Sequence, residues 1–115
     1  RIQFGKPIIA FQYIGFKLAD MATEINAARH LVWHAAWLLD NEKKASKESA
    51  MAKVYGSDIA MKITVDAVQI LGGYGYMREF GLEKMMRDAA TLALIPVSNA
   101  RAELLITALH KQELT

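Results

Sequence analysis

The chain has 115 residues, 53% of them hydrophobic, with 14 basic and 12 acidic residues and no cysteine. This length suits one domain with its own core, and the lack of cysteine excludes disulfides and zinc sites built on thiolates. The dispersed, nearly balanced charge argues against nucleic-acid binding, and no apolar run reaches the roughly 18 residues that span a bilayer. The start "RIQFGKP" lacks the apolar stretch of a signal peptide, so we expect a soluble intracellular protein.

A long helix is predicted over residues 11–40, where apolar residues recur at steps of three and four. The predicted apolar stripe is Leu18, Met21, Ala22, Ile25, Ala28, Val32, Ala35, Ala36 and Leu39. The polar residues Lys17, Thr23, Glu24, Asn26, His30 and His34 are expected on the opposite face. A second long helix is predicted over residues 47–71, with Ser46 as its N-cap. Glycines within residues 72–75 then predict a turn.

Two shorter helices are predicted after this turn. One covers residues 82–94, and the other is capped by Ser98 and continues to about His110, with Pro96 preventing a continuous helix. No segment alternates with period two, so the predicted fold is all-α: an up-down helical bundle with two long and two short helices. Because only two helices are long, we expect a further helix before Arg1, or a partner chain, to cover the remaining apolar stripe.

Two local motifs have ordinary structural explanations. The glycine-rich stretch "GGYGYMREFG" (72–81) could approach a phosphate closely, but a Rossmann fingerprint follows a strand and this stretch follows a predicted helix. It is explained by a helix end and a turn. His30 and His34 have the i, i+4 spacing of metal ligands, but no third ligand accompanies them, so no metal site is expected.

Three longer stretches together resemble the C-terminal helical domain of acyl-CoA dehydrogenases. They are "RIQFGKPIIAFQYIGFKLADMATEINAAR" (1–29), "AMAKVYGSDIAMKITVDAVQILGGYGY" (50–76) and "EKMMRDA" (83–89). They follow one another in the family's order and at its spacing. The resemblance implies one domain over residues 1–115, incomplete at its N-terminus, from an FAD flavoprotein that forms a homo-oligomer (a dimer or a tetramer).

The resemblance also implies a set of FAD-binding residues. Arg1 is expected at the FAD diphosphate, Phe4 at the adenosine end and Gln12 at the same cofactor. The second FAD-binding segment is Gln69, Ile70, Leu71, Gly72 and Gly73. In this family such residues largely serve the FAD of a neighbouring subunit.

The chain departs from the family where the catalytic carboxylate is expected. Family members read "RDAxxxxIYEGTSE", whereas this chain reads "RDAATLALIPVSNARAE" (87–103). Pro96 therefore occupies the position of the glutamate base, Val97 that of the glycine and Ser98 that of the threonine. Proline cannot accept a proton. No catalytic residue is identifiable, while Ser98 keeps a hydroxyl that we expect at the flavin.

Two functions remain open from the sequence. The first is the C-terminal domain of an FAD-dependent acyl-CoA dehydrogenase, which oxidises the α,β-bond of an acyl-CoA with its base supplied elsewhere and an electron-transfer protein as a partner. The second is a non-catalytic helical module that was retained for oligomerisation. The expected location is the cytoplasm, or the mitochondrial matrix in a eukaryote. By itself, the piece is expected to be inactive and at least dimeric.

Overall fold

The computed structural model describes residues 1–95 and 97–114. It confirms the all-α class and both long helices, α1 (Gln12–Asp40) and α2 (Ser46–Leu71). The two shorter helices are α4 (Leu82–Leu92) and α5 (Asn99–Glu113). Ser98 is the N-cap of α5, as predicted, and its hydroxyl accepts a hydrogen bond from the Arg101 backbone N–H at 3.4 Å. Pro96, the predicted break, lies outside the described residues.

The N-cap prediction for α2 is wrong by one residue. Ser46 is the first residue of the helix, and the cap position is Ala45, whose side chain cannot accept a hydrogen bond. Gly72 ends α2 as expected, but the chain then forms the short helix α3 (Gly73–Tyr76) where a simple turn was predicted. Gly75 permits this close packing, because a Cβ there would lie only 2.5 Å from the Val68 carbonyl oxygen.

A small hairpin at the N-terminus was not predicted. It pairs β1 (Ile2–Gln3) with β2 (Lys6–Pro7) in antiparallel register and is followed by the 3-10 turn η1 (Ile8–Ala10). A second 3-10 turn, η2 (Arg78–Phe80), joins α3 to α4. Two residues per strand are too few to produce a recognisable period-two pattern.

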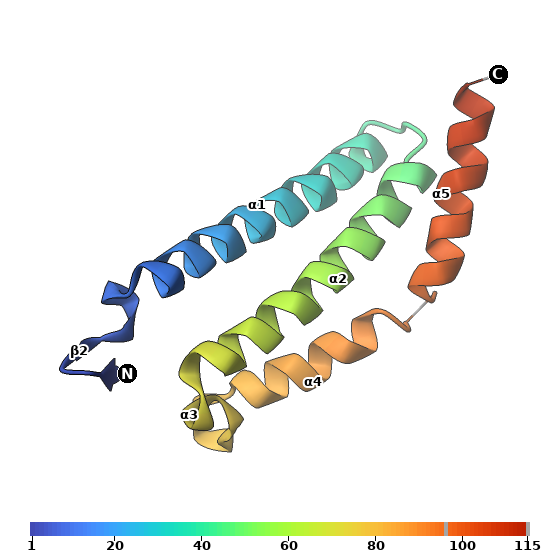
Figure 1. Cartoon of the computed structure of the whole chain (residues 1–115). Coiled ribbons are helices and arrows are strands. Elements are labelled where there is room, and N and C mark those ends of the chain that lie inside the picture. Colours follow the sequence, from blue (N-terminus) through green and yellow to red (C-terminus); the bar gives the residue numbers. More distant parts are fainter. Residues whose placement is uncertain (96, 115) are drawn as a thin grey trace.

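The helices are arranged around α2 (Figure 1). On one side α1 runs antiparallel to it, and on the other side α4 and α5 follow one another along its length. The hairpin and α3 lie at one end of the molecule, and the C-terminus lies at the other. The result is elongated, with extents of 60 × 25 × 25 Å.

Small side chains fill most of the buried space between the helices. The buried hydrophobic residues among those described are Met21, Ala35, Ala45, Ala50, Ala52, Ala89 and Ala102. Alanine lets helices approach closely but removes little apolar area from water. The predicted stripe of α1 is only partly covered, since Ile25, Val32 and Leu39 remain 42%, 49% and 60% exposed.

Two residues expected on the polar face of α1 instead reach α2. Lys17 Nζ lies 3.0 Å from Asp66 Oδ1, and Glu24 forms an ion pair with Lys62. Their long side chains extend from the flank of the helix toward the partner charges, which helical periodicity alone does not reveal. These two pairs connect α1 to the C-terminal half of α2.

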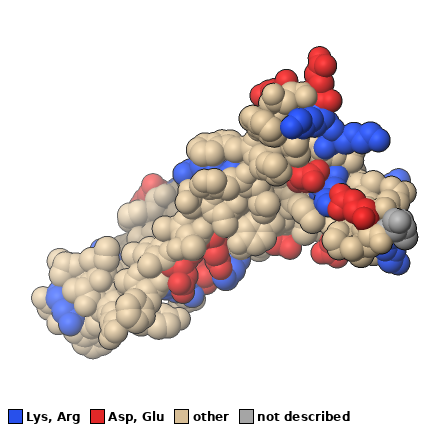
Figure 2. Space-filling view, turned by 90° about the horizontal axis from the view of Figure 1, so that it is seen from above, with Lys and Arg blue, Asp and Glu red and all other residues tan. Residues whose placement is uncertain are grey.

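Charges of both signs are interspersed on the surface seen in Figure 2, with broad uncharged areas between them. Neither sign forms a continuous patch on this face. Within residues 1–95 and 97–114, no helix combines the length and apolar character needed to cross a membrane.

Candidate functional site

The N-terminal hairpin presents Phe4 to the outside. Phe4 and Gly5 form its two-residue loop, and both have positive φ, of 53° and 77°. Positive φ at both positions is the pattern of a type I′ turn, which matches the twist of the paired strands. Glycine adopts this conformation freely, but a bulky residue is strained there by about 1–3 kcal/mol. Phe4 is 93% exposed, so burial within this chain does not compensate for the strain.

A hollow of about 330 Å³ lies between the hairpin, the start of α1 and the last turns of α2. Four predicted cofactor residues line it together: Arg1, Phe4, Gln69 and Ile70. The rest of its wall consists of Gln3, Ile8, Phe11, Tyr13, Ile14 and Lys17. The fold thus joins two predicted segments that are distant in sequence into one concave surface.

The Arg1 guanidinium lies against the backbone of Gly72. A Cβ at Gly72 would overlap Nη1 of Arg1 and would lie 3.0 Å from its Cζ. Gly72 also has φ 59° and ψ −134°, a combination that is strongly disfavoured for residues with a side chain. Glycine is therefore required here both for the backbone conformation and for the approach of Arg1.

The hollow carries one cation without a counter-charge. Lys17 is paired with Asp66, and this hydrogen bond raises the pKa of Lys17 above its usual value, so the lysine is charged at neutral pH. Arg1 has no ion-pair partner among the described residues. A planar guanidinium with free N–H groups is well suited to phosphate oxygens. The hollow can therefore accept an anion.

The remaining predicted cofactor residues near this end do not line the hollow. Gln12 is the exposed first residue of α1, and Leu71 is the half-buried last residue of α2. Gly73 is exposed at the start of α3. Gly72 meets the hollow through its contact with Arg1.

Ser98 lies in a different region of the chain. The neighbouring Asn99 side chain is hydrogen bonded to Ser57, which is 12 residues before Gln69 in α2. At 1.5 Å per residue, that separation is about 18 Å along the helix. Ser98 and Arg1 could therefore share a ligand only if it were long, or if Ser98 and Arg1 came from different copies of the chain.

The sequence reasoning missed Gln3, Tyr13 and Lys17 as lining residues. Tyr13 and Lys17 are four positions apart near the start of α1, so their side chains lie on the same helix face. That spacing could have associated them with Arg1 only if the hairpin had been predicted. Gln3 is placed by the hairpin itself.

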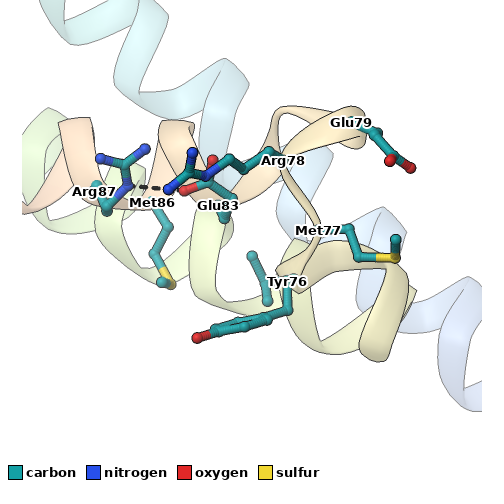
Figure 3. A pocket seen from close by; sticks show the side chains of 8 residues that line it. Tyr76, Met77, Arg78, Glu79, Glu83, Met86 and Arg87 are labelled. Atoms are coloured by element: carbon teal, nitrogen blue, oxygen red, sulfur yellow. Dashed lines mark hydrogen bonds and ion pairs between the residues drawn. The ribbon is translucent and has the colours of Figure 1, made fainter.

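A second hollow, of about 640 Å³, lies between the end of α2 and α4 (Figure 3). Its labelled lining residues are Tyr76, Met77, Arg78, Glu79, Glu83, Met86 and Arg87. None belongs to the predicted cofactor set. Arg87 Nε donates to Glu83 Oε2 at 2.8 Å, so these two charges satisfy one another.

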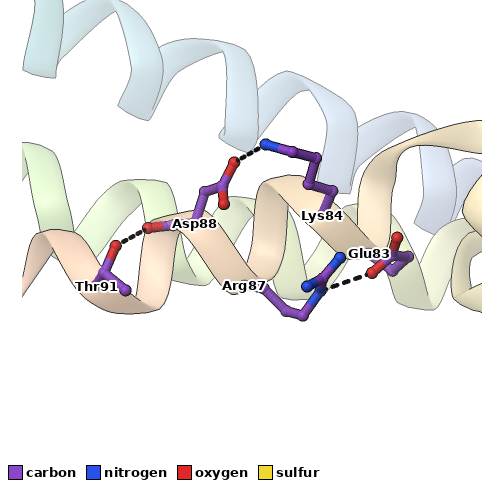
Figure 4. Close-up of polar contacts among 5 residues, drawn as sticks. All are labelled: Glu83, Lys84, Arg87, Asp88 and Thr91. Atoms are coloured by element: carbon purple, nitrogen blue, oxygen red, sulfur yellow. Dashed lines mark hydrogen bonds and ion pairs between the residues drawn. The ribbon is translucent and has the colours of Figure 1, made fainter.

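The pair of Glu83 and Arg87 is one of two i, i+4 ion pairs on α4 (Figure 4). The other joins Lys84 Nζ to Asp88 Oδ2 at 2.5 Å. Surface i, i+4 pairs of this kind stabilise a helix only slightly. They explain the charges of α4 as helix stabilisation, without a ligand.

The two histidines of α1 have local partners. His30 Nδ1 is 2.7 Å from the Asn26 carbonyl oxygen, and the His34 ring stacks on Trp37. In the described part of the chain, no three His, Cys, Asp or Glu side chains gather into a group that could hold a metal ion.

Comparison with known proteins identifies the family. The model of the family described as "Acyl-CoA dehydrogenase, C-terminal domain" matches residues 1–95. The chain belongs to this family. An acyl-CoA dehydrogenase of Bacillus subtilis (strain 168) is 50% identical over 107 residues, which are 93% of this chain and 28% of the relative.

Two solved structures share the fold of this chain. Butyryl-CoA dehydrogenase from Megasphaera elsdenii is 44% identical with a TM-score of 0.92, over 94% of this chain and 28% of the other. A structure described as the FAD complex of PigA is 28% identical with a TM-score of 0.89, again over 94% of this chain and 28% of the other. This chain therefore spans a little over a quarter of the length of these proteins. The family match ends at residue 95, next to Pro96.

Proposed function

We propose that the protein is an FAD-dependent acyl-CoA dehydrogenase, and that this chain contributes FAD contacts and subunit association. The observation that carries the proposal is the hollow at the hairpin, where Arg1, Phe4 and Gln69 meet around an uncompensated positive charge. The names of the relatives support an acyl-CoA as the substrate class, and the FAD complex of a structural relative supports the cofactor. An electron-transfer protein as the acceptor stays a prediction from the family resemblance.

The residues present fit such a cofactor. In this proposal Arg1 neutralises part of the diphosphate, and Phe4, strained and exposed, stacks at the adenosine end. Gly72 lets the backbone come close to the cofactor, and Gln69 and Ile70 contact it in the hollow. Gln12, Leu71 and Gly73 provide contacts beside the hollow. Bound FAD would supply the acceptor for the hydride that leaves Cβ of the acyl-CoA thioester. This chain's part is to bind and orient the cofactor.

Removal of the α-proton requires a base that the identified residues do not supply. A general base must hold a titratable group within reach of the proton, and Pro96 at the family's glutamate position has none. We therefore propose that the carboxylate comes from another part of the protein.

The test is Arg1→Ala in the full-length protein, with FAD retention measured by flavin absorbance per protein. Loss of a charge-assisted contact costs about 1.5–3 kcal/mol, so FAD should bind roughly 10- to 100-fold more weakly with little change in the melting temperature. Arg29→Ala, an exposed arginine on α1 away from the hollow, is the matched control. Equal affinity in Arg1→Ala and parent, or a parent protein that binds no FAD, would refute the proposal.

A second candidate function is a non-catalytic assembly module, which the missing carboxylate at position 96 favours and with which the exposed apolar surface agrees. The chain has 8307 Å² of accessible surface, against roughly 6,300 Å² for a folded monomer of this mass. Phe16 and Trp33 are 62% and 60% exposed, and large exposed apolar areas usually mark interfaces.

Both candidates predict association, and only the first predicts turnover. Sedimentation of the 115-residue piece should show at least a dimer, and a stable monomer at micromolar concentration would contradict the assembly role. FAD-dependent oxidation of an acyl-CoA by the full-length protein would decide for the enzyme. A flavin-loaded full-length protein without turnover on a panel of acyl-CoAs would decide for the module.

A further inference from the structure

A hydrogen-bond network ties both described ends of the α4–α5 connection to α2. Lys53 Nζ donates to the Ala93 carbonyl oxygen at 3.2 Å and to Asn99 Oδ1 at 2.6 Å. The Asn99 backbone N–H donates to the same Ala93 carbonyl at 3.0 Å. Ala93 follows the last residue of α4 and Asn99 is the first residue of α5. One ammonium group on α2 therefore joins Ala93 and Asn99, which lie on the two sides of the connection.

The Asn99 amide is fixed in one orientation by opposite charges at its two ends. Its Oδ1 accepts from the Lys53 ammonium, while its Nδ2 donates to Asp58 Oδ1 at 2.7 Å and to Ser57 Oγ at 2.8 Å. Turning the amide over would place its NH₂ group against the ammonium and its oxygen against the carboxylate. Charge-assisted hydrogen bonds of this kind are stronger than neutral ones.

Partial burial favours this hydrogen-bond arrangement over alternatives. Ser57 is only 5% exposed, and Lys53 and Asn99 are half-buried. A buried polar group that loses its partner is destabilising, so arrangements that separate Asn99 from Lys53 and Ser57 are disfavoured. An apolar contact between α2 and α5 would hold the helices together without this directional constraint.

The network also determines where the Ser98 hydroxyl lies. Ser98 precedes Asn99 directly, and its Oγ accepts a hydrogen bond from the Arg101 backbone N–H. A hydroxyl that accepts in this way still has its own proton to donate. We propose that Lys53 is the positioning residue of the α4–α5 connection, and that through Asn99 and the Ala93 carbonyl it holds the Ser98 hydroxyl at the flavin. This inference rests on the proposed function, which assigns Ser98 to the flavin.

The test compares Lys53→Met, Lys53→Arg and Lys47→Met in the full-length flavoprotein. Methionine keeps the length of the side chain and removes its donors, whereas arginine keeps a charge and several N–H groups. Lys47→Met removes another contact between α2 and α5, the ion pair of Lys47 with Glu113, without touching the connection. The two measurements are amide hydrogen exchange over residues 99–102 and the position and shape of the flavin absorption bands.

Lys53→Met should exchange about tenfold faster at residues 99–102 and should shift the flavin bands, because loss of a charge-assisted hydrogen bond suffices for a factor of this size. Lys53→Arg should restore both, and Lys47→Met should change neither. Unchanged exchange and an unchanged flavin spectrum in Lys53→Met would overturn the inference. Faster exchange with an unchanged spectrum would overturn its link to the flavin. A parent protein without flavin would refute the proposed function, and the exchange measurement would still test the role of Lys53 in the connection.

Discussion

The two regions that α2 joins are built in opposite ways. At the C-terminal end of α2, the hairpin leaves Arg1 without an ion-pair partner in the described chain and holds Phe4 strained and 93% exposed. Beside the N-terminal half of α2, Ser57 and Asp58 of that helix accept hydrogen bonds from both N–H groups of the Asn99 amide.

The hairpin surface is thus suited to a ligand from outside the chain, whereas the ends of the α4–α5 connection are held by hydrogen bonds within the chain. A strained aromatic and an unpaired guanidinium gain from a ligand, whereas a closed polar network gains nothing further from one. Changes at the hairpin should therefore act mainly on cofactor binding, and changes at the connection mainly on folding stability.

The largest effect is expected from Gly72→Ala. The new Cβ would displace the Arg1 guanidinium. The alanine would also have to adopt a backbone conformation that is strongly disfavoured for residues with a side chain. We expect FAD to bind roughly 100-fold more weakly, measured by equilibrium titration of the full-length protein, because the charge-assisted contact is lost. Gly56→Ala is the control, since Gly56 is outside the predicted cofactor set and a Cβ there meets nothing within 4 Å. Similar losses in both variants would remove the specific role of Gly72.

Asn99→Ala should change stability instead. Its removal leaves the Lys53 ammonium and the buried Ser57 without a shared partner, at a cost of about 2 kcal/mol in the free energy of unfolding. Chemical denaturation would measure it, with Asn26→Ala on the exposed face of α1 as the control. If Arg1→Ala destabilised the fold as much as Asn99→Ala does, the contrast between the two regions would fail.

A smaller effect on stability is expected from Gly56→Ala in α2 and Gly5→Ala in the hairpin, with opposite signs in the two variants. A Cβ meets nothing within 4 Å at either position, but Gly56 is inside α2 and Gly5 has φ 77° in the hairpin. Alanine should stabilise the helix by about 0.5–1 kcal/mol and destabilise the hairpin by a similar amount. Thermal unfolding of both variants would measure this, and equal signs would show that backbone conformation does not decide the outcome.

The smallest effect is a pH dependence at the C-terminal end of α5. A hydrogen bond from Lys47 lowers the pKa of Glu113 below its usual 4.5. A carboxylate with a lowered folded-state pKa contributes stability above its unfolded-state pKa, and this contribution disappears as pH falls through the folded-state pKa. The parent should therefore melt slightly above Glu113→Gln at pH 7, and the difference between the two melting temperatures should shrink as the pH falls below 4.5. A constant difference between pH 7 and pH 3 would contradict the ion pair.

The sequence by itself determined the features that depend on local physics. Periodicity predicted α1 and α2 closely, and the glycine at 72 and the serine at 98 marked a helix end and a helix start. These predictions succeed because apolar spacing, glycine dihedrals and capping act within a few residues of one another. The family motifs also selected Arg1, Phe4, Gln69 and Ile70, which the fold brings together around one hollow.

Only the tertiary structure decided which side chains meet across helices. Lys17 and Glu24 were expected on the polar face, yet both pair with α2. Lys53 and Asn99 are 46 positions apart, so no local pattern could join them. The hairpin that positions Arg1 against Gly72 could not be predicted either, because its strands are too short to show a period-two pattern. Such contacts depend on the register in which the packed helices meet, and that register is set by side chains distant in the sequence.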